Sequence, residues 1–154
     1  MATFRGEVVH TWTVQRSPAD ALAFFSDLDQ TVRHTVDLAC HERLDARTLR
    51  LELTEQRSGK ATYTPRYTVR YHPDPAAGVL RWASLDDGGS MQISGEARFS
   101  GPEEGPTTLH WAERVAVEVP LNRLLGRAVA PVAEGLIRRG IRGYVDRMIE
   151  TLEG

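Results

Sequence analysis

The sequence predicts an α+β protein in which a curved antiparallel sheet of about seven strands wraps around one long C-terminal helix. Apolar and polar residues alternate with a period of two through most of the chain, as they do in strands with one buried face. From Leu121 to Leu152 the apolar residues instead recur every three or four positions, which is typical of an amphipathic helix. A helix long enough to lie across a sheet leaves a groove between the two layers. We therefore expect a binding cavity there.

The first strand is expected from Phe4 to Val14, with Val8, His10, Trp12 and Val14 on one face. Ser17 is a good N-cap, Pro18 suits the first helical position, and an acid follows at Asp20. These residues predict a short helix that ends near Ser26. A second short helix is expected over residues 29–35.

Six further strands are predicted by alternation of apolar and polar residues. They cover residues 36–41, 49–54 and 63–71, the segment around Leu80 and Trp82, and residues 91–99 and 109–119. The third of these is expected to stop at His72-Pro73-Asp74-Pro75, because proline has no N–H to donate to a neighbouring strand. Asp86-Asp87-Gly88-Gly89 is expected to form a turn.

The composition is that of one ordinary globular domain spanning residues 1–154. A formal charge of −2 argues against a nucleic-acid surface. No apolar stretch is long enough to cross a bilayer and no signal peptide is visible, so no integral membrane association is expected. Cys40 is the only cysteine, which excludes an internal disulfide and favours the cytoplasm.

The order of these elements resembles the START/polyketide cyclase-dehydrase and lipid-transport superfamily, which has the helix-grip fold. More specifically, Tyr71-His72-Pro73-Asp74-Pro75, Gly78-Val79-Leu80-Arg81-Trp82, Gly89-Ser90-Met91 and Gly95 are similar to a bacterial branch of that superfamily. The resemblance covers nearly the whole chain. It implies a pocket for a hydrophobic ligand such as a sterol, lipid, quinone, polyketide or hormone. It implies no catalytic residue, because the shared motifs belong to the fold.

Glu113 is the first candidate for chemistry, because it is in phase with Leu109, Trp111, Val115 and Val117 on the face expected to point inward. A buried carboxyl group has a raised pKa, as general acids and bases often do. Two interpretations stay open. Glu113 could bind or activate a ligand, or it could lie at the cavity mouth or pair with an inward arginine.

His10 is the matching candidate on the first strand. If Val14 lies opposite Leu109 and Phe4 opposite Val119, the indices of facing residues add to 123, and His10 then faces Glu113. We expect both side chains to point inward, within reach of a hydrogen bond or a single water molecule. Such a pair would serve as a proton relay or polar anchor, or it would be a satisfied core pair.

Six aromatic residues complete the predicted cavity lining. Tyr63, Tyr67 and Tyr71 are in phase on one predicted strand and combine apolar bulk with a hydroxyl group. Trp12, Trp82 and Trp111 are predicted to form core or pocket wall. The same residues would suit an ordinary core. His34, Asp37 and His41 have a spacing that suggests metal ligands, but they cross a predicted boundary between a helix and a strand, so we expect no metal. No nucleophile motif or phosphate-binding glycine motif is present, and we expect no cofactor.

The leading hypothesis is therefore the binding, transport or sequestration of a small hydrophobic ligand in the cavity. One alternative is a protein-interaction module without a small-molecule ligand. Another is an enzyme of the cyclase or dehydratase type that uses Glu113 and His10. The sequence leaves open the ligand, the oligomeric state and whether a reaction is catalysed. It also leaves open whether the arginine-rich face of the C-terminal helix is simply solvated or docks on a membrane or a partner.

Overall fold

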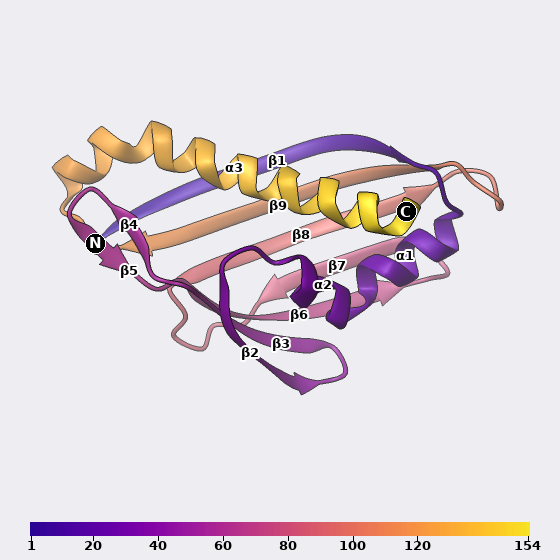
Figure 1. The fold of residues 1–154 in the computed structure, drawn as a ribbon, viewed down its shortest axis with the longest axis horizontal. Helices are drawn as coiled ribbons and strands as arrows, with labels where there is room; N and C mark the ends of the chain where they lie inside the picture. Colours follow the sequence, from indigo (N-terminus) through magenta and orange to yellow (C-terminus); the bar gives the residue numbers. More distant parts are fainter.

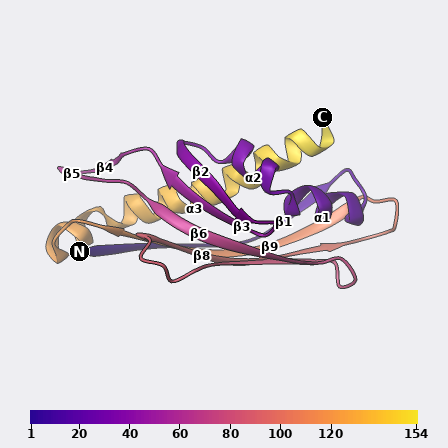
Figure 2. The ribbon, with the colours of Figure 1, turned by 90° about the horizontal axis from the view of Figure 1, so that it is seen from below.

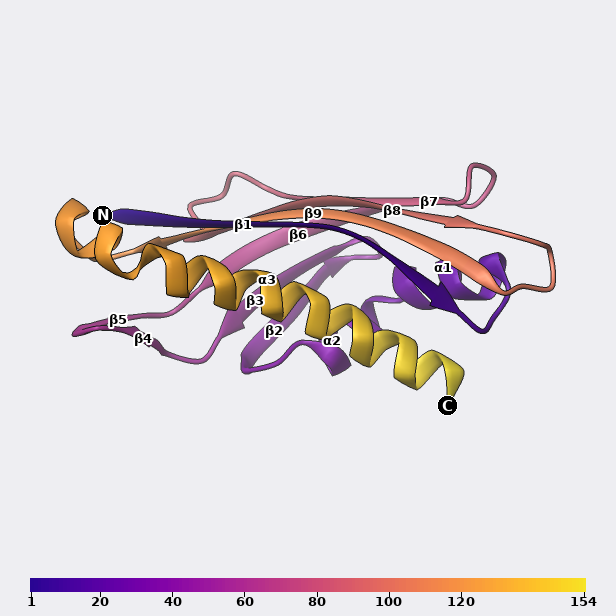
Figure 3. The same cartoon turned by 90° about the horizontal axis from the view of Figure 1, so that it is seen from above.

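The computed structural model describes every residue from Met1 to Gly154 and has the predicted α+β architecture. Seven antiparallel strands form one sheet in the order β1-β9-β8-β7-β6-β3-β2, and the helices lie against one face of it (Figures 1 and 3). The strands of this sheet are β1 (Ala2–Val14), β2 (Leu38–Asp45), β3 (Thr48–Leu53), β6 (Arg66–Asp74), β7 (Val79–Ser84), β8 (Met91–Ser100) and β9 (Thr107–Val119). The helices are α1 (Pro18–Ser26), α2 (Leu28–His34) and α3 (Arg123–Glu153), and a separate hairpin is formed by β4 (Gln56–Ser58) and β5 (Ala61–Tyr63).

The long helix α3 is attached to the edge strand β1 along its length, and Figure 2 shows it on the same side of the sheet as α1 and α2. Near the middle of β1, Gly6 allows the close approach: a Cβ atom there would lie 2.5 Å from Cγ2 of Ile137. Further along, Nε1 of Trp12 donates a hydrogen bond of 2.9 Å to Asp146. None of the helices is both long enough and apolar enough to span a membrane.

The start of α1 confirms the N-cap predicted from the sequence. Oγ of Ser17 accepts a hydrogen bond from the backbone N–H of Asp20 at 3.1 Å, and Pro18 occupies the first turn. The helix then buries Ala21, Leu22 and Phe25 against the sheet. The cap therefore fixes where the chain turns from β1 into the core.

We expect Ser17→Ala to lower the free energy of unfolding by about 1 kcal/mol, because one N–H group at the start of α1 loses its acceptor. Urea denaturation of the two proteins would measure this difference. Ser17→Asp is the control and should restore most of the loss, since aspartate is an equally good cap. If alanine and aspartate behaved alike, the cap would not stabilise the helix.

The predicted strand over residues 63–71 is wrong at both ends. Tyr63 belongs to the hairpin strand β5, and β6 begins only at Arg66 and runs on through Pro73. Pro73 is tolerated because Tyr71, two residues earlier, donates its N–H toward Arg47 on the β3 side of β6. The nitrogen of Pro73 faces that same side, where the ladder between β3 and β6 has already ended at Arg70.

Candidate functional site

A cavity of about 560 Å³ lies between the sheet and α3. Of the 29 residues that line it, 19 are hydrophobic. The lining comes from β1, β3 and β6 to β9, from all three helices, from residues 35–37, and from the segment around β4 and β5. The lining residues that are also exposed mark its mouth. These mouth residues include Val36, Arg57, Leu136 and Arg139. The size and apolar lining suit a small organic molecule.

Glu113 lies on the wall of this cavity, where it is 6 % exposed. Its Oε2 accepts a hydrogen bond of 2.7 Å from Nε1 of Trp82, although β8 separates their two strands. Residues Trp82, Gly95 and Glu113 are neighbours across β7, β8 and β9. Because Gly95 has no side chain, the indole of Trp82 can lie across β8 and reach the carboxyl group.

No positive charge balances Glu113, since none of the ion pairs in the protein includes it. Burial therefore raises its pKa to about 7, while the indole N–H groups of Trp82 and Trp111 act in the opposite direction. Of the two indoles, only that of Trp82 makes a hydrogen bond of good geometry, and Nε1 of Trp111 is buried without a partner. Near neutral pH, Glu113 can thus either donate or accept a proton.

Three tyrosine hydroxyls add to the polar groups of the cavity. Tyr67, Tyr71 and Tyr144 all line it, and burial raises the pKa of each phenol above its ordinary value. They therefore act as neutral hydrogen-bond donors. The hydroxyl of Tyr144 also lies 3.4 Å from Oγ1 of Thr31, which connects α3 to α2. The cavity combines an apolar wall with a few polar groups, the pattern expected of a ligand site.

The structure places six of the eight predicted lining residues on the cavity wall: Tyr63, Tyr67, Tyr71, Trp82, Trp111 and Glu113. Their contact with a ligand remains a prediction. Several lining residues were not singled out from the sequence. Tyr144 is one of them. The sequence feature that could have identified it is a side chain with a hydroxyl group on the apolar stripe of α3 that faces the sheet. Thr31, Arg139 and Arg147 carry no comparable sequence signal.

His10 and Trp12 are not on the cavity wall, and the predicted pairing of His10 with Glu113 is wrong. In the observed register Val8 faces Glu113 and His10 faces Trp111. The prediction was off by two because Ala2 and Thr107 extend the two strands, so that Ala2 pairs with Val119 and Val14 with Thr107. The His10 ring is exposed and stacks edge-on against Trp12, with ring centroids 4.6 Å apart.

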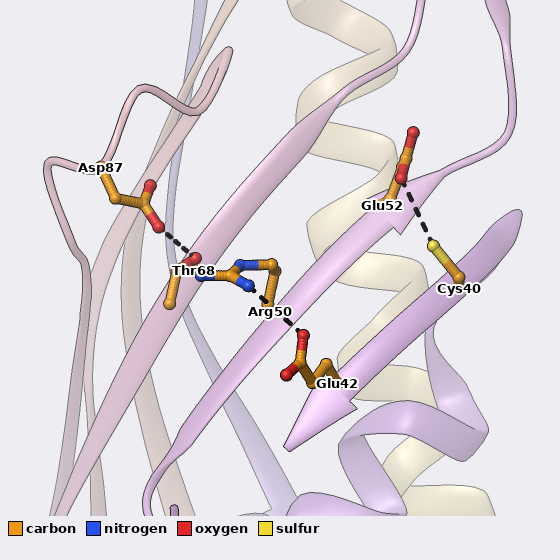
Figure 4. Close-up of polar contacts among 6 residues, drawn as sticks. All are labelled: Cys40, Glu42, Arg50, Glu52, Thr68 and Asp87. Atoms are coloured by element: carbon orange, nitrogen blue, oxygen red, sulfur yellow. Dashed lines mark hydrogen bonds and ion pairs between the residues drawn. The ribbon is translucent and has the colours of Figure 1, made fainter. Parts of the chain in front are cut away.

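A second hollow lies over β2, β3, β6 and residues 87–89. Figure 4 shows the polar contacts among six of the residues that line it. Its polar side chains bind one another: Arg50 pairs with Glu42 at 3.3 Å, and Thr68 donates to Asp87. The thiol of Cys40 donates to Glu52 at 3.3 Å, and this hydrogen bond is the largest cause that raises the pKa of the thiol. We assign no ligand to this hollow.

Solved structures share this architecture at low sequence identity. The aromatase/cyclase Zhui from Streptomyces sp. R1128 is 15% identical with a TM-score of 0.66, and the match covers 97% of this chain and 94% of that one. A truncated norcoclaurine synthase from Thalictrum flavum is 11% identical with a TM-score of 0.61, over 99% and 96% of the two chains. A Staphylococcus aureus protein of unknown function is 16% identical with a TM-score of 0.63, over 98% and 95%. No family model and no curated protein sequence matches the chain.

Proposed function

We propose that this protein, which has the helix-grip fold of the START/polyketide cyclase superfamily, binds one small and mainly apolar ligand in the cavity between the sheet and α3. Lipids, quinones and polyketides are the classes of ligand that fit this description. The observation that supports it most directly is the cavity of about 560 Å³ whose apolar wall carries a buried carboxyl group, Glu113. A protein-interaction module without a ligand would have a filled interior, so the cavity favours ligand binding. We propose that the protein binds this ligand in the cytoplasm.

The polar groups of the cavity favour a ligand with at least one oxygen function. Oε2 of Glu113 accepts the hydrogen bond from Trp82, and no hydrogen bond is made to Oε1. Nε1 of Trp111 is a buried donor without a partner. A ligand hydroxyl could donate to Glu113, and a ligand carbonyl could accept from Trp111. A pure hydrocarbon would leave both groups unsatisfied and should bind more weakly.

Tryptophan fluorescence tests the proposal, because Trp82 and Trp111 line the cavity and Trp12 does not. Native mass spectrometry of protein purified from its own host would identify candidate ligands that co-purify. Titration with such a ligand, or with panels of lipids, quinones and aromatic polyketides, is expected to quench the emission in a saturable manner.

Two single variants locate the response. Trp12→Phe should leave the ligand-induced quenching intact, because Trp12 lies outside the cavity and hydrogen-bonds to Asp146. Trp111→Phe should remove a large part of the quenching. Absence of any saturable response across the ligand panels, together with no co-purifying molecule, would contradict the proposed binding function.

Glu113 also favours a second function, a cyclase or dehydratase reaction in which it transfers a proton. Its pKa of about 7 is suited to a general acid or base at neutral pH. His10 takes no part in this version, since it is exposed and faces Trp111. Incubation with an identified ligand, followed by mass spectrometry, tests for cyclisation or loss of water. Conversion that survives in Glu113→Gln would exclude Glu113 as the proton-transfer group.

A further inference from the structure

The first half of α3 carries a stripe of large apolar side chains that nothing in the protein covers. Leu124 is 77 % exposed, Leu125 51 %, Val132 69 % and Leu136 56 %. At 100° per residue these four positions fall within an arc of about 120° on the helix, and we call them the α3 stripe. They are half of the eight large hydrophobic residues that are exposed in the whole chain. Such clustering is typical of an interaction surface.

The same segment is strongly basic. Between Arg123 and Arg142 the chain has five arginines and one acid, Glu134. Subtracting these from the chain's 19 basic and 21 acidic residues leaves 14 and 20 in the rest of the molecule. The segment thus carries a net charge of +4 in a protein whose remainder is acidic. None of its arginines takes part in an ion pair. Positive charge beside exposed apolar side chains complements a surface of anionic lipids.

The α3 stripe is continuous with the mouth of the cavity. Leu136 belongs to the stripe and also lines the cavity, and exposed Arg139 on the next turn lines it as well. Val36, another exposed apolar residue, also lines the cavity. The β4–β5 hairpin, which carries Arg57 on the cavity wall, is at the same end of the molecule as the start of α3 (Figures 1 and 3).

We propose that the first half of α3 docks on the surface of an anionic phospholipid membrane. The helix lies in the plane of the interface, with the α3 stripe among the acyl chains and the arginines at the headgroups. The cavity mouth then opens next to the lipid. A symmetric dimer through this stripe is disfavoured, because it would bring five arginines from each copy together. The docking stands independently of which ligand the cavity binds.

Vesicle co-sedimentation tests the docking on the intact protein. The probes are vesicles of phosphatidylcholine alone and vesicles in which a third of the lipid is phosphatidylglycerol. We expect the protein to pellet with the anionic vesicles and to stay largely in solution with the neutral ones. The fraction bound should fall as salt is added, since the arginines contribute through screened charges.

Matched pairs of variants separate the two contributions. The double variant Leu124→Gln/Val132→Gln removes apolar contact without touching the cavity lining, and Val9→Gln is its control at an equally exposed apolar residue on β1. Arg123→Gln/Arg127→Gln removes charge, and Arg47→Gln in the turn between β2 and β3 is its control. Each double variant should lower partition onto anionic vesicles about tenfold, and each control less than twofold.

Three results would overturn the proposal: no sedimentation with anionic vesicles, equal sedimentation with both kinds, or loss of partition in the controls as well. A shift of the wild-type protein to a dimer in size-exclusion chromatography, reversed by Leu124→Gln/Val132→Gln, would assign the stripe to a second copy instead. Fluorescence titration of a soluble ligand without vesicles tests the cavity separately. The double variants should bind such a ligand within twofold of the wild type, so docking and ligand binding can fail independently.

Discussion

Gly95→Ala is expected to lower the free energy of unfolding by about 3 kcal/mol, even though it adds a single methyl group. A Cβ atom at this position would lie 2.6 Å from Cε2 of Trp82 and 2.8 Å from the backbone oxygen of Ala112. The backbone of β9 cannot retreat without breaking its ladder, so the indole of Trp82 must move. Its hydrogen bond to Glu113 is then lost, and a buried carboxyl group is left without its donor.

Urea denaturation at pH 7 measures this effect, and Gly135→Ala is the matched control. Gly135 lies within α3, where a Cβ atom would meet only the guanidinium of Arg138 at 3.9 Å. Alanine there should raise the stability by up to about 1 kcal/mol through its better helix propensity. If Gly95→Ala changed the stability as little as the control, the position of the Trp82 indole across β8 would not require a glycine at residue 95.

The inward position of Glu113 could be predicted from the sequence, because alternation along one strand fixes which face each residue occupies. The residue of β1 that lies opposite Glu113 could not be predicted. Pairing across β1 and β9 depends on where the strands end, and Ala2 and Thr107 extend them beyond the apolar pattern. A shift of two residues keeps both faces correct while replacing His10 by Val8 opposite Glu113.

The contact between Trp82 and Glu113 lies beyond what periodicity can predict. It joins residues 31 positions apart on strands that are not neighbours, and it depends on the glycine between them.

The buried face of the long helix α3 could not be predicted from the sequence either. Its sequence shows one apolar stripe in the first half and another in the second: Ile141 and Met148 of the second are buried, whereas Leu125, Val132 and Leu136 of the first are exposed. Which stripe meets the sheet is decided by tertiary packing, which the spacing of apolar residues does not describe.

Glu113→Gln is expected to make the protein more stable than the wild type above pH 7, by about 3 kcal/mol. The pKa of Glu113 is about 7 in the folded protein, whereas in the unfolded chain it has the ordinary value of 4.5. Below pH 4.5 the group is protonated in both states and contributes no difference. As the pH rises from 4.5 to 7 the unfolded chain loses this proton first, so the wild type loses stability, and the loss is complete above pH 7.

Glutamine carries no charge at any of these pH values and can still accept the hydrogen bond from Trp82. The advantage of Glu113→Gln should therefore be near zero at pH 4 and reach its full size at pH 8, as measured by urea denaturation at both. Glu118→Gln, at an exposed position on the same strand, should differ little from the wild type at either pH. An advantage of equal size at both pH values would mean that Glu113 destabilises the fold through packing rather than through its charge. The expected pattern would instead identify a carboxyl group that reduces stability at neutral pH, as residues kept for binding or catalysis often do.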